Sequence, residues 1–150
     1  MKTFWITLLI AMAPIIELRG AIPYGLTAGL PYGKAYLAAL IGNMLPVPVI
    51  ILGIRAIFDW MRTHLPKFGG WIDRIEKRGE EKAALVKKYK YLGLFILVAI
   101  PFPVTGAWMG SLVAALLNLR IKYAFPVIFA GVATAGVLML LLSHGVISIL

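Results

Sequence analysis

Apolar residues fill most of the chain, and the breaks between apolar stretches divide it into elements. Residues 35–58 and 123–150 are each long enough to cross the roughly 30 Å hydrocarbon core of a bilayer as a helix. Residues 3–16 are too few for a crossing, and residues 92–119 are interrupted by prolines and glycines. The pattern therefore predicts two spanning helices and two broken apolar segments.

Prolines and glycines fall where a regular helix cannot continue. In the first broken segment they run from Pro14 to Gly33, and in the second they lie within the string IPFPVTGAWMG. Irregular backbone is tolerated at membrane depth only where protein or a water-filled cavity satisfies its polar groups. We expect two re-entrant helical hairpins, the first with its tip at residues 20–25. Pro46 and Pro48 should kink the span 35–58.

Residues 59–91 have a different character, because charged side chains dominate. Pro66 and the pair Gly69 and Gly70 interrupt the beginning, and a helix is predicted from about residue 71 to 90. Its apolar residues recur near helical spacing, which is typical of an amphipathic helix resting on a membrane surface; they are Phe68, Ile72, Ile75, Ala83 and Val86.

Composition and charge place the chain in a membrane. It has 150 residues, 61% of them hydrophobic and 14% charged, and such a balance excludes an ordinary soluble domain. We predict one all-α integral membrane domain, 1–150. The net charge is +9, and most of the bases lie in 59–91, so the positive-inside rule places this basic connector in the cytoplasm of a multi-pass protein of the inner (plasma) membrane. With no cysteine, the chain has no disulfide and no thiol chemistry.

The two halves carry the same order of elements. An offset of 86 residues places Gly20 on Gly106 and Lys34 on Arg120, so a first repeat, 1–58, and a second repeat, 92–150, each consist of a broken hairpin and a long helix. An odd number of crossings in each half would make the repeats inverted, with both termini outside. The alternative topology has four full spans and both termini inside.

The motifs ELRGAIPYG and PFPVTGAWMG, one in each half with a basic helix between them, resemble the family of small multidrug export proteins. The resemblance covers nearly the whole chain and implies transport. More distantly, the layout is similar to the DedA or VTT-domain superfamily, whose members have two opposed re-entrant hairpins and are implicated in lipid flipping and proton-dependent homeostasis. Glu17 would correspond to the hairpin acid of that superfamily, whereas Arg19 departs from its usual pattern. The second hairpin has no acid, which argues against a two-carboxylate proton mechanism.

Glu17 and Arg19 are the strongest candidates for a site, since charges at membrane depth are costly and usually functional. Arg19 suits an anionic group, and Glu17 would be the titrating group of a proton-coupled step. The alternative is a buried ion pair that only holds the hairpin in place. The predicted pathway also includes residues beside the two tips and one in the kinked span: Gly20, Pro23, Tyr24, Asn43, Pro103, Thr105, Gly106 and Trp108. Glycines can equally serve helix packing, and aromatic residues the membrane interface.

We therefore expect a transporter of the small multidrug export type that moves a small or amphiphilic substrate, anionic substrates included, between two opposed hairpins. The alternatives are a lipid or polyprenyl-phosphate flippase or scramblase, and a structural or accessory membrane protein that transports nothing. The sequence carries no catalytic motif and no metal or cofactor signature, so we expect no enzyme. The expected partners are membrane lipids, the substrate and a second copy in a homodimer, but no nucleic acid.

Overall fold

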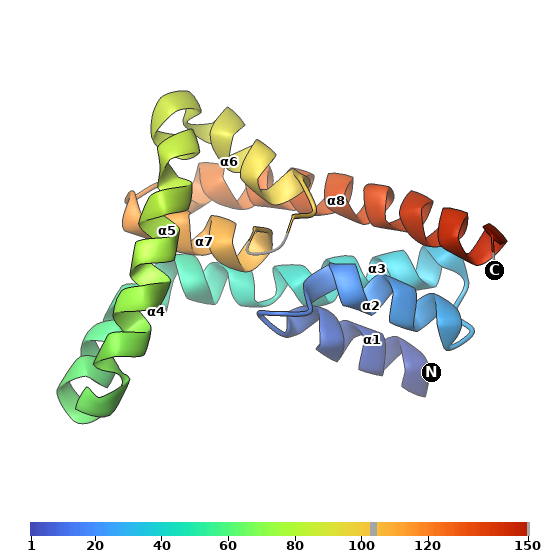
Figure 1. Cartoon of the computed structure of the whole chain (residues 1–150), viewed down its shortest axis with the longest axis horizontal. Helices are drawn as coiled ribbons and strands as arrows, with labels where there is room; N and C mark the ends of the chain where they lie inside the picture. Colours follow the sequence, from blue (N-terminus) through green and yellow to red (C-terminus); the bar gives the residue numbers. More distant parts are fainter. Residues whose placement is uncertain (103–104, 150) are drawn as a thin grey trace.

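The computed structural model describes residues 1–102 and 105–149, and every element in them is helical (Figure 1). This confirms the predicted all-α class. The elements are α1 (Lys2–Met12), α2 (Glu17–Thr27), α3 (Tyr32–Met44), α4 (Pro46–His64), the short 3₁₀ helix η1 (Pro66–Phe68), α5 (Gly69–Tyr89), α6 (Tyr91–Ala99), α7 (Ala107–Leu116) and α8 (Ile121–Ile149).

Two helical segments of the described chain are long and apolar enough to cross a membrane. They are Tyr32–His64, which joins α3 and α4 over 33 residues, and Ile121–Ile149 with 29 residues. Both coincide with the predicted spans. The other apolar helices are much shorter, since α2 has 11 residues and α6 has 9. At 1.5 Å per residue such helices reach only about half-way through a hydrocarbon core of about 30 Å.

The prolines that were predicted to kink the first span lie at the boundary between α3 and α4. Helix α3 ends at Met44 and α4 begins at Pro46, while Leu45 between them keeps helical angles (φ −58, ψ −44). Pro46 and Pro48 have no backbone N–H, so the carbonyls of Gly42 and Met44 lose their helical donors. The direction of the chain continues through the break, which makes α3 and α4 one interrupted membrane segment.

The first turn lies earlier in the chain than predicted. Helix α1 ends at Met12, Ala13 before Pro14 is extended (φ −69, ψ 135), and α2 begins at Glu17. The predicted tip, residues 20–25, is wrong, because these residues lie inside α2. The physical reason is Pro14, which forces the preceding residue out of the helical region. Gly25 serves packing instead, against Thr7 of α1 and Ala35 of α3.

Matching features of the two halves lie 89 residues apart, not 86. Positive φ angles occur at Glu17 and Gly106 at the starts of α2 and α7, and at Gly29 and Asn118 after their ends (106 − 17 and 118 − 29 both give 89). The same spacing relates the backbone hydrogen bonds that end these helices: Ala28, Gly29 and Leu30 donate to Tyr24, Leu26 and Gly25, and Leu117, Asn118 and Leu119 donate to Val113, Ala115 and Ala114. Gly20 therefore has no counterpart in Gly106.

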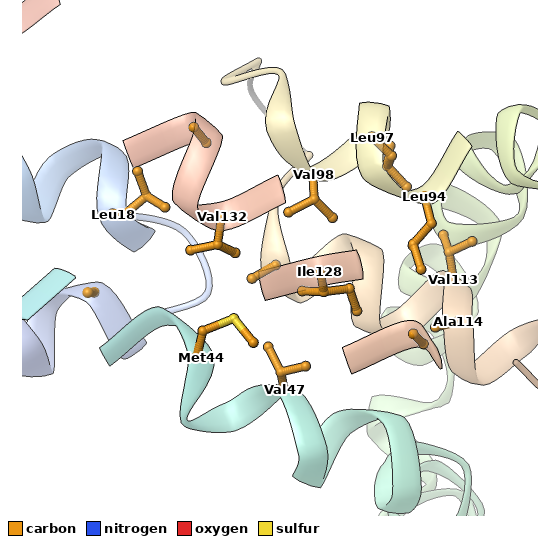
Figure 2. Close-up of a cluster of buried hydrophobic side chains, with 14 of the residues drawn as sticks. Leu18, Met44, Val47, Leu94, Leu97, Val98, Val113, Ala114, Ile128 and Val132 are labelled. Atoms are coloured by element: carbon orange, nitrogen blue, oxygen red, sulfur yellow. The ribbon is translucent and has the colours of Figure 1, made fainter. Parts of the chain in front are cut away.

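The buried core joins the two halves (Figure 2). Side chains from α2, α3 and α4 pack against side chains from α6, α7 and α8, and both groups are almost inaccessible; they include Leu18, Met44, Val47, Leu94, Val98, Val113, Ile128 and Val132. Glycines make the close contacts possible: a Cβ at Gly42 would collide with the carbonyl of Leu8, and one at Gly131 with Val98. These glycines are thus used within the chain, and they do not support the predicted homodimer.

Helix α5 crosses the end of the bundle at a steep angle to α3 and α8 (Figure 1). Its apolar face packs on protein: Ile72 and Val86 are buried, and Gly79 lies against Leu112 and Leu116 of α7. The prediction that this face rests on a membrane surface is therefore wrong, because neighbouring helices already cover it. Two charge-assisted hydrogen bonds tie α5 to α4, from Arg62 to Asp73 (2.7 Å) and to Glu76 (2.6 Å); they are exposed and stabilise the contact only modestly.

Helices α4 and α8 each make a polar contact with the opposite half of the chain. Arg55 of α4 donates to Asn118 Oδ1 (2.9 Å) and to the carbonyl of Leu116 (2.6 Å), at the end of α7. His144 of α8 contacts the hydroxyl of Tyr32 (3.0 Å), at the start of α3. Arg55 and His144 are themselves 89 residues apart (144 − 55). These contacts link α4 to the end of α7, and α8 to the start of α3.

Candidate functional site

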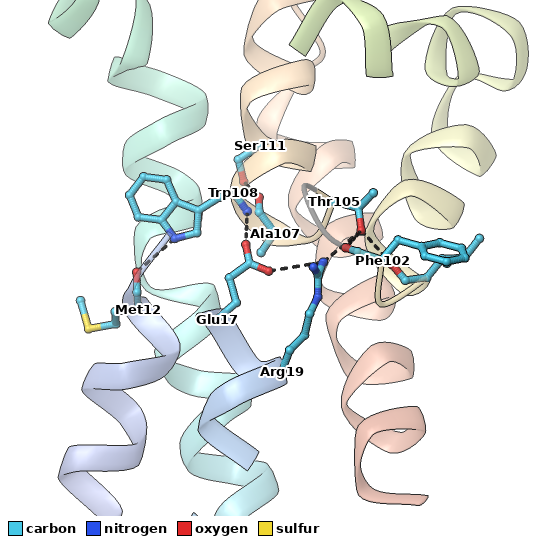
Figure 3. Close-up of polar contacts among 9 residues, drawn as sticks. Met12, Glu17, Arg19, Phe102, Thr105, Ala107, Trp108 and Ser111 are labelled. Atoms are coloured by element: carbon cyan, nitrogen blue, oxygen red, sulfur yellow. Dashed lines mark hydrogen bonds and ion pairs between the residues drawn. The ribbon is translucent and has the colours of Figure 1, made fainter. Parts of the chain in front are cut away.

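Glu17 is the centre of the site, and its backbone conformation places it there. It is the first residue of α2, it has φ 51, and only 3% of it is exposed. Its Oε1 accepts a hydrogen bond from the backbone N–H of Trp108 (3.2 Å), in the first turn of α7 (Figure 3). The indole N–H of Trp108 donates to the carbonyl of Met12 (3.1 Å). The start of α7 is thus hydrogen bonded to both sides of the α1–α2 turn.

Arg19 lies on the other side of the carboxylate. Its Nη2 is 3.7 Å from Glu17 Oε2 and donates a hydrogen bond to Thr105 Oγ1 (3.0 Å) (Figure 3). The Thr105 hydroxyl has two carbonyls within reach, those of Phe102 (2.7 Å) and Ile100 (2.9 Å). Side chains two positions apart on a regular helix, such as those of residues 17 and 19, would point in nearly opposite directions. The positive φ of Glu17 removes it from helical register, which is how both side chains reach the same space.

Gly106 makes the close approach possible. It has φ 104, and a Cβ built on it would collide with the Glu17 carboxylate and lie 2.8 Å from Arg19 Nη2. Only glycine adopts this conformation without strain. The backbone before α7 therefore lies directly against the charged pair at the start of α2, and a side chain at position 106 would occupy the same space.

A cavity of about 630 Å³ opens from the charged pair. Its wall is mainly apolar, and its polar groups are few; its lining includes Ile50, Ile54 and Phe58 of α4, Trp71, Ile75 and Arg78 of α5, and Met109 and Leu112 of α7. Glu17, Arg19 and Thr105 contribute polar groups to the lining, and the exposed Arg78 contributes a second cation. The volume lies in the range of small-molecule sites, in which an apolar wall carries a few polar groups that set orientation.

The charge balance of this cavity favours an anion. The charged side chains that line the cavity are Glu17, Arg19 and Arg78, and together they carry a net charge of +1 in a largely apolar space. The planar guanidinium group offers several N–H donors to a carboxylate or phosphate. Residues 1–102 and 105–149 contain no group of three His, Cys, Asp or Glu side chains placed to hold a metal ion.

Half of the residues predicted from the sequence meet at this site. Glu17, Arg19, Thr105, Gly106 and Trp108 lie together. Four others do not line the cavity: Gly20, Pro23 and the exposed Tyr24 lie along α2, and Asn43 is buried in α3. Pro103 lies outside the described residues.

The apolar wall was not predicted, although the sequence contained a signal. Ile50, Ile54 and Phe58 are four residues apart and so share one face of α4. Trp71, Ile75 and Arg78 likewise share one face of α5, and of these three only Ile75 belonged to the predicted membrane-facing surface. Helical spacing can show that residues share a face, and only the tertiary structure shows that both faces line one cavity.

Comparison with known proteins agrees with the resemblance found in the motifs. No curated protein and no solved structure matches the chain. One family does match, over residues 17–138, which begin at the buried carboxylate and end within α8. Because this match covers most of the sequence, the chain belongs to the family described as "Putative small multi-drug export protein".

Proposed function

We propose that this membrane protein is a transporter whose substrate passes through the cavity beside Glu17 and Arg19. The observation that carries the proposal is the cavity itself, which combines a largely buried charged pair with an apolar wall. A small anion with an apolar body, up to the size of a drug molecule, would fit this distribution. The family description points to export of small molecules and agrees with this class of function.

The proposed architecture is an inverted repeat of two re-entrant hairpins, α1 with α2 and α6 with α7. Three observations support it: the helices are too short to span, matching features recur at 89 residues, and the starts of α2 and α7 meet at Glu17 and Trp108. Helix N-termini carry a partial positive charge, so two of them near one point would add to the attraction for an anion.

We place the basic connector in the cytoplasm of the inner membrane and both termini outside. Single cysteines introduced at Lys2, Lys34 and Lys77 would be the only thiols of each variant, because the natural chain has none. An impermeant thiol reagent added to intact cells should label the first two and spare the third. Labelling at position 77 from outside would reverse the orientation.

Transport is tested with purified protein in liposomes and two dyes of similar size and opposite charge. Carboxyfluorescein, an amphiphilic anion, should cross faster in protein-containing vesicles than in empty ones, and ethidium, a cation, should not. Arg19→Gln should reduce the anion flux at least tenfold, since it removes one of the two cations that line the cavity. Equal flux of both dyes, or full flux in the Arg19 variant, would contradict the proposed site.

A lipid flippase is the second candidate, because the apolar wall and the two arginines of the cavity would also accept an acyl chain and a phosphate. This reading predicts that fluorescently labelled phosphatidylglycerol changes leaflet in protein-containing liposomes, again with loss in Arg19→Gln. Movement of labelled lipid without movement of carboxyfluorescein would assign the cavity to lipids.

A structural role is the third candidate, favoured by the fact that Glu17 and Arg19 both have protein partners. Thermal melting of Glu17→Gln and Arg19→Ala, measured beside the two flux assays, separates this role from transport. Loss of stability in both variants, with no flux of any probe through the wild-type protein, would make the pair a structural element only.

A further inference from the structure

A second pocket shares no lining residue with the first cavity. It has a volume of about 470 Å³ and forms where α5 passes into α6 and α7 into α8; its lining is Lys90, Tyr91, Asn118, Leu119, Arg120 and Tyr123. Lys90 and Arg120, which are far apart in sequence, thus meet at one concave site. Both are exposed, so their charges are available to a ligand.

The positive charge of this pocket has no acidic counterpart nearby in the chain. Lys87 and Lys88 precede Lys90 by one turn, and Lys122 follows Arg120, whereas the sequence contains no Asp or Glu after Glu81. Asp73 and Glu76 are occupied by Arg62. A pocket lined by two cations and no carboxylate, with further lysines adjacent in sequence, attracts an anion over the distance of a Debye length.

The pocket lies where the charged connector meets the apolar helices. Tyr91 begins α6, Tyr123 lies in the first turn of α8, and their ring centroids are 5.9 Å apart. Beyond them the helices are apolar, with Leu92 60% exposed. Tyrosines at the ends of apolar helices are typical of the headgroup level of a bilayer, where the ring is buried and the hydroxyl stays hydrated.

Two unusual backbone conformations shape this pocket. Lys90 has φ 54 with ψ −121, and Asn118 has φ 52. Asparagine tolerates positive φ, but lysine does so rarely. Asn118 is held by its hydrogen bond from Arg55. The lysine therefore occupies a strained position at which glycine would be easier to accommodate, although glycine would provide no charge.

We propose that this pocket binds the phosphate headgroup of an anionic phospholipid, with the acyl chains lying along the exposed apolar surface of α6 and α8. Basic pockets between membrane helices are recognised sites for such headgroups. The chemistry that Lys90 and Arg120 recognise, a phosphate, is shared with free inorganic phosphate. A lipid is favoured because apolar surface adjoins the cations. The proposal requires the membrane location and is independent of the transported substrate.

The test uses the full-length protein in a neutral detergent and measures binding by native mass spectrometry and by the shift in melting temperature. Three probes are compared: dioctanoyl phosphatidylglycerol, dioctanoyl phosphatidylcholine and inorganic phosphate. We expect saturable binding of phosphatidylglycerol that weakens with salt, and little binding of the other two. Equal binding of phosphatidylcholine would overturn the proposal, and inorganic phosphate binding as tightly as phosphatidylglycerol would replace the lipid by a free anion.

Variants show whether binding takes place in this pocket. Arg120→Gln and Lys90→Gly should each weaken phosphatidylglycerol binding about fivefold, the factor that corresponds to ~1 kcal/mol for one basic side chain near anionic lipid. Lys90→Gly should also melt at an equal or higher temperature, because it relieves the strained φ, so its lost binding cannot be ascribed to unfolding. Lys77→Gln, which removes an exposed lysine elsewhere on α5, is the matched control. Unchanged binding in the Lys90 and Arg120 variants, or an equal loss in the control, would contradict the site.

Discussion

The carboxylate of Glu17 occupies the space into which a side chain at Gly106 would project. Glu17 is the first residue of α2 and Gly106 immediately precedes α7; they are 89 positions apart, and both have positive φ. In one half of the chain the position carries an acid, and in the other it carries nothing beyond the backbone. The asymmetry lets one carboxylate lie against the start of the opposite helix.

Gly106→Ala tests this relationship. The new methyl group would collide with the Glu17 carboxylate and force an unfavourable φ, so we expect a loss of at least about 2 kcal/mol in the free energy of unfolding. Thermal melting in detergent measures it. The control is Gly33→Ala, at a position with nothing within 4 Å, where the melting temperature should stay unchanged or rise. Equal melting of the two variants would contradict the close packing at residue 106.

Removing the charge of Arg19 should lower the stability of the protein more than removing the charge of Glu17. The Glu17 side chain is 4% exposed and that of Arg19 20%, so a carboxylate left alone is the more poorly solvated of the two. We expect Arg19→Gln to lower the free energy of unfolding by up to about 3 kcal/mol, and Glu17→Gln by less. The double variant should regain part of the loss, because it leaves no unpaired charge. Strictly additive losses in this cycle would mean that the two groups do not interact.

Asn43 is predicted to destabilise the fold. It is completely buried, and within the described residues neither polar atom of its side chain has a hydrogen-bond partner. Asn43→Val should raise the free energy of unfolding by about 1 kcal/mol, since it removes two unsatisfied polar groups. Val132, 89 residues later (132 − 43) and also buried, allows the reciprocal control, and Val132→Asn should destabilise. If Asn43→Val instead abolishes dye flux without loss of stability, Asn43 belongs to the pathway after all.

Filling the cavity should block transport without unfolding the protein. Ile54 faces the cavity from α4, and Ile54→Trp would place an indole in the apolar part of a space of about 630 Å³. We expect carboxyfluorescein flux to fall several-fold while the melting temperature changes little. Leu52→Trp is the control, because Leu52 is 72% exposed and two residues away on the opposite side of the helix. Equal inhibition by both variants would indicate a general effect of the added tryptophan.

Hydrophobic patterning was sufficient to predict the element types, since length and apolarity of a spanning helix follow directly from bilayer thickness. Two helical segments long and apolar enough to span coincide with the predicted spans. At the predicted kink, the structure has a boundary between two helices, with Leu45 between them in helical conformation. The charged pair was also identified from the sequence alone, because Glu17 and Arg19 interrupt an apolar stretch. Turn positions were less accurate: the first tip was placed too late, since glycines that serve packing look the same in sequence as glycines that serve a turn.

The sequence by itself determined that this is a helical membrane protein in which a charged pair interrupts an apolar stretch, because these properties depend on composition and local order. The tertiary structure decided what the pair contacts. The hydrogen bond from Trp108 to Glu17 joins residues 91 positions apart, and the contact of Arg19 with Thr105 joins residues 86 apart. Local conformational propensities cannot specify contacts between residues so far apart in the sequence. They follow from the packing of two halves around one core, which also places α4 and α5 across the cavity and brings Lys90 beside Arg120.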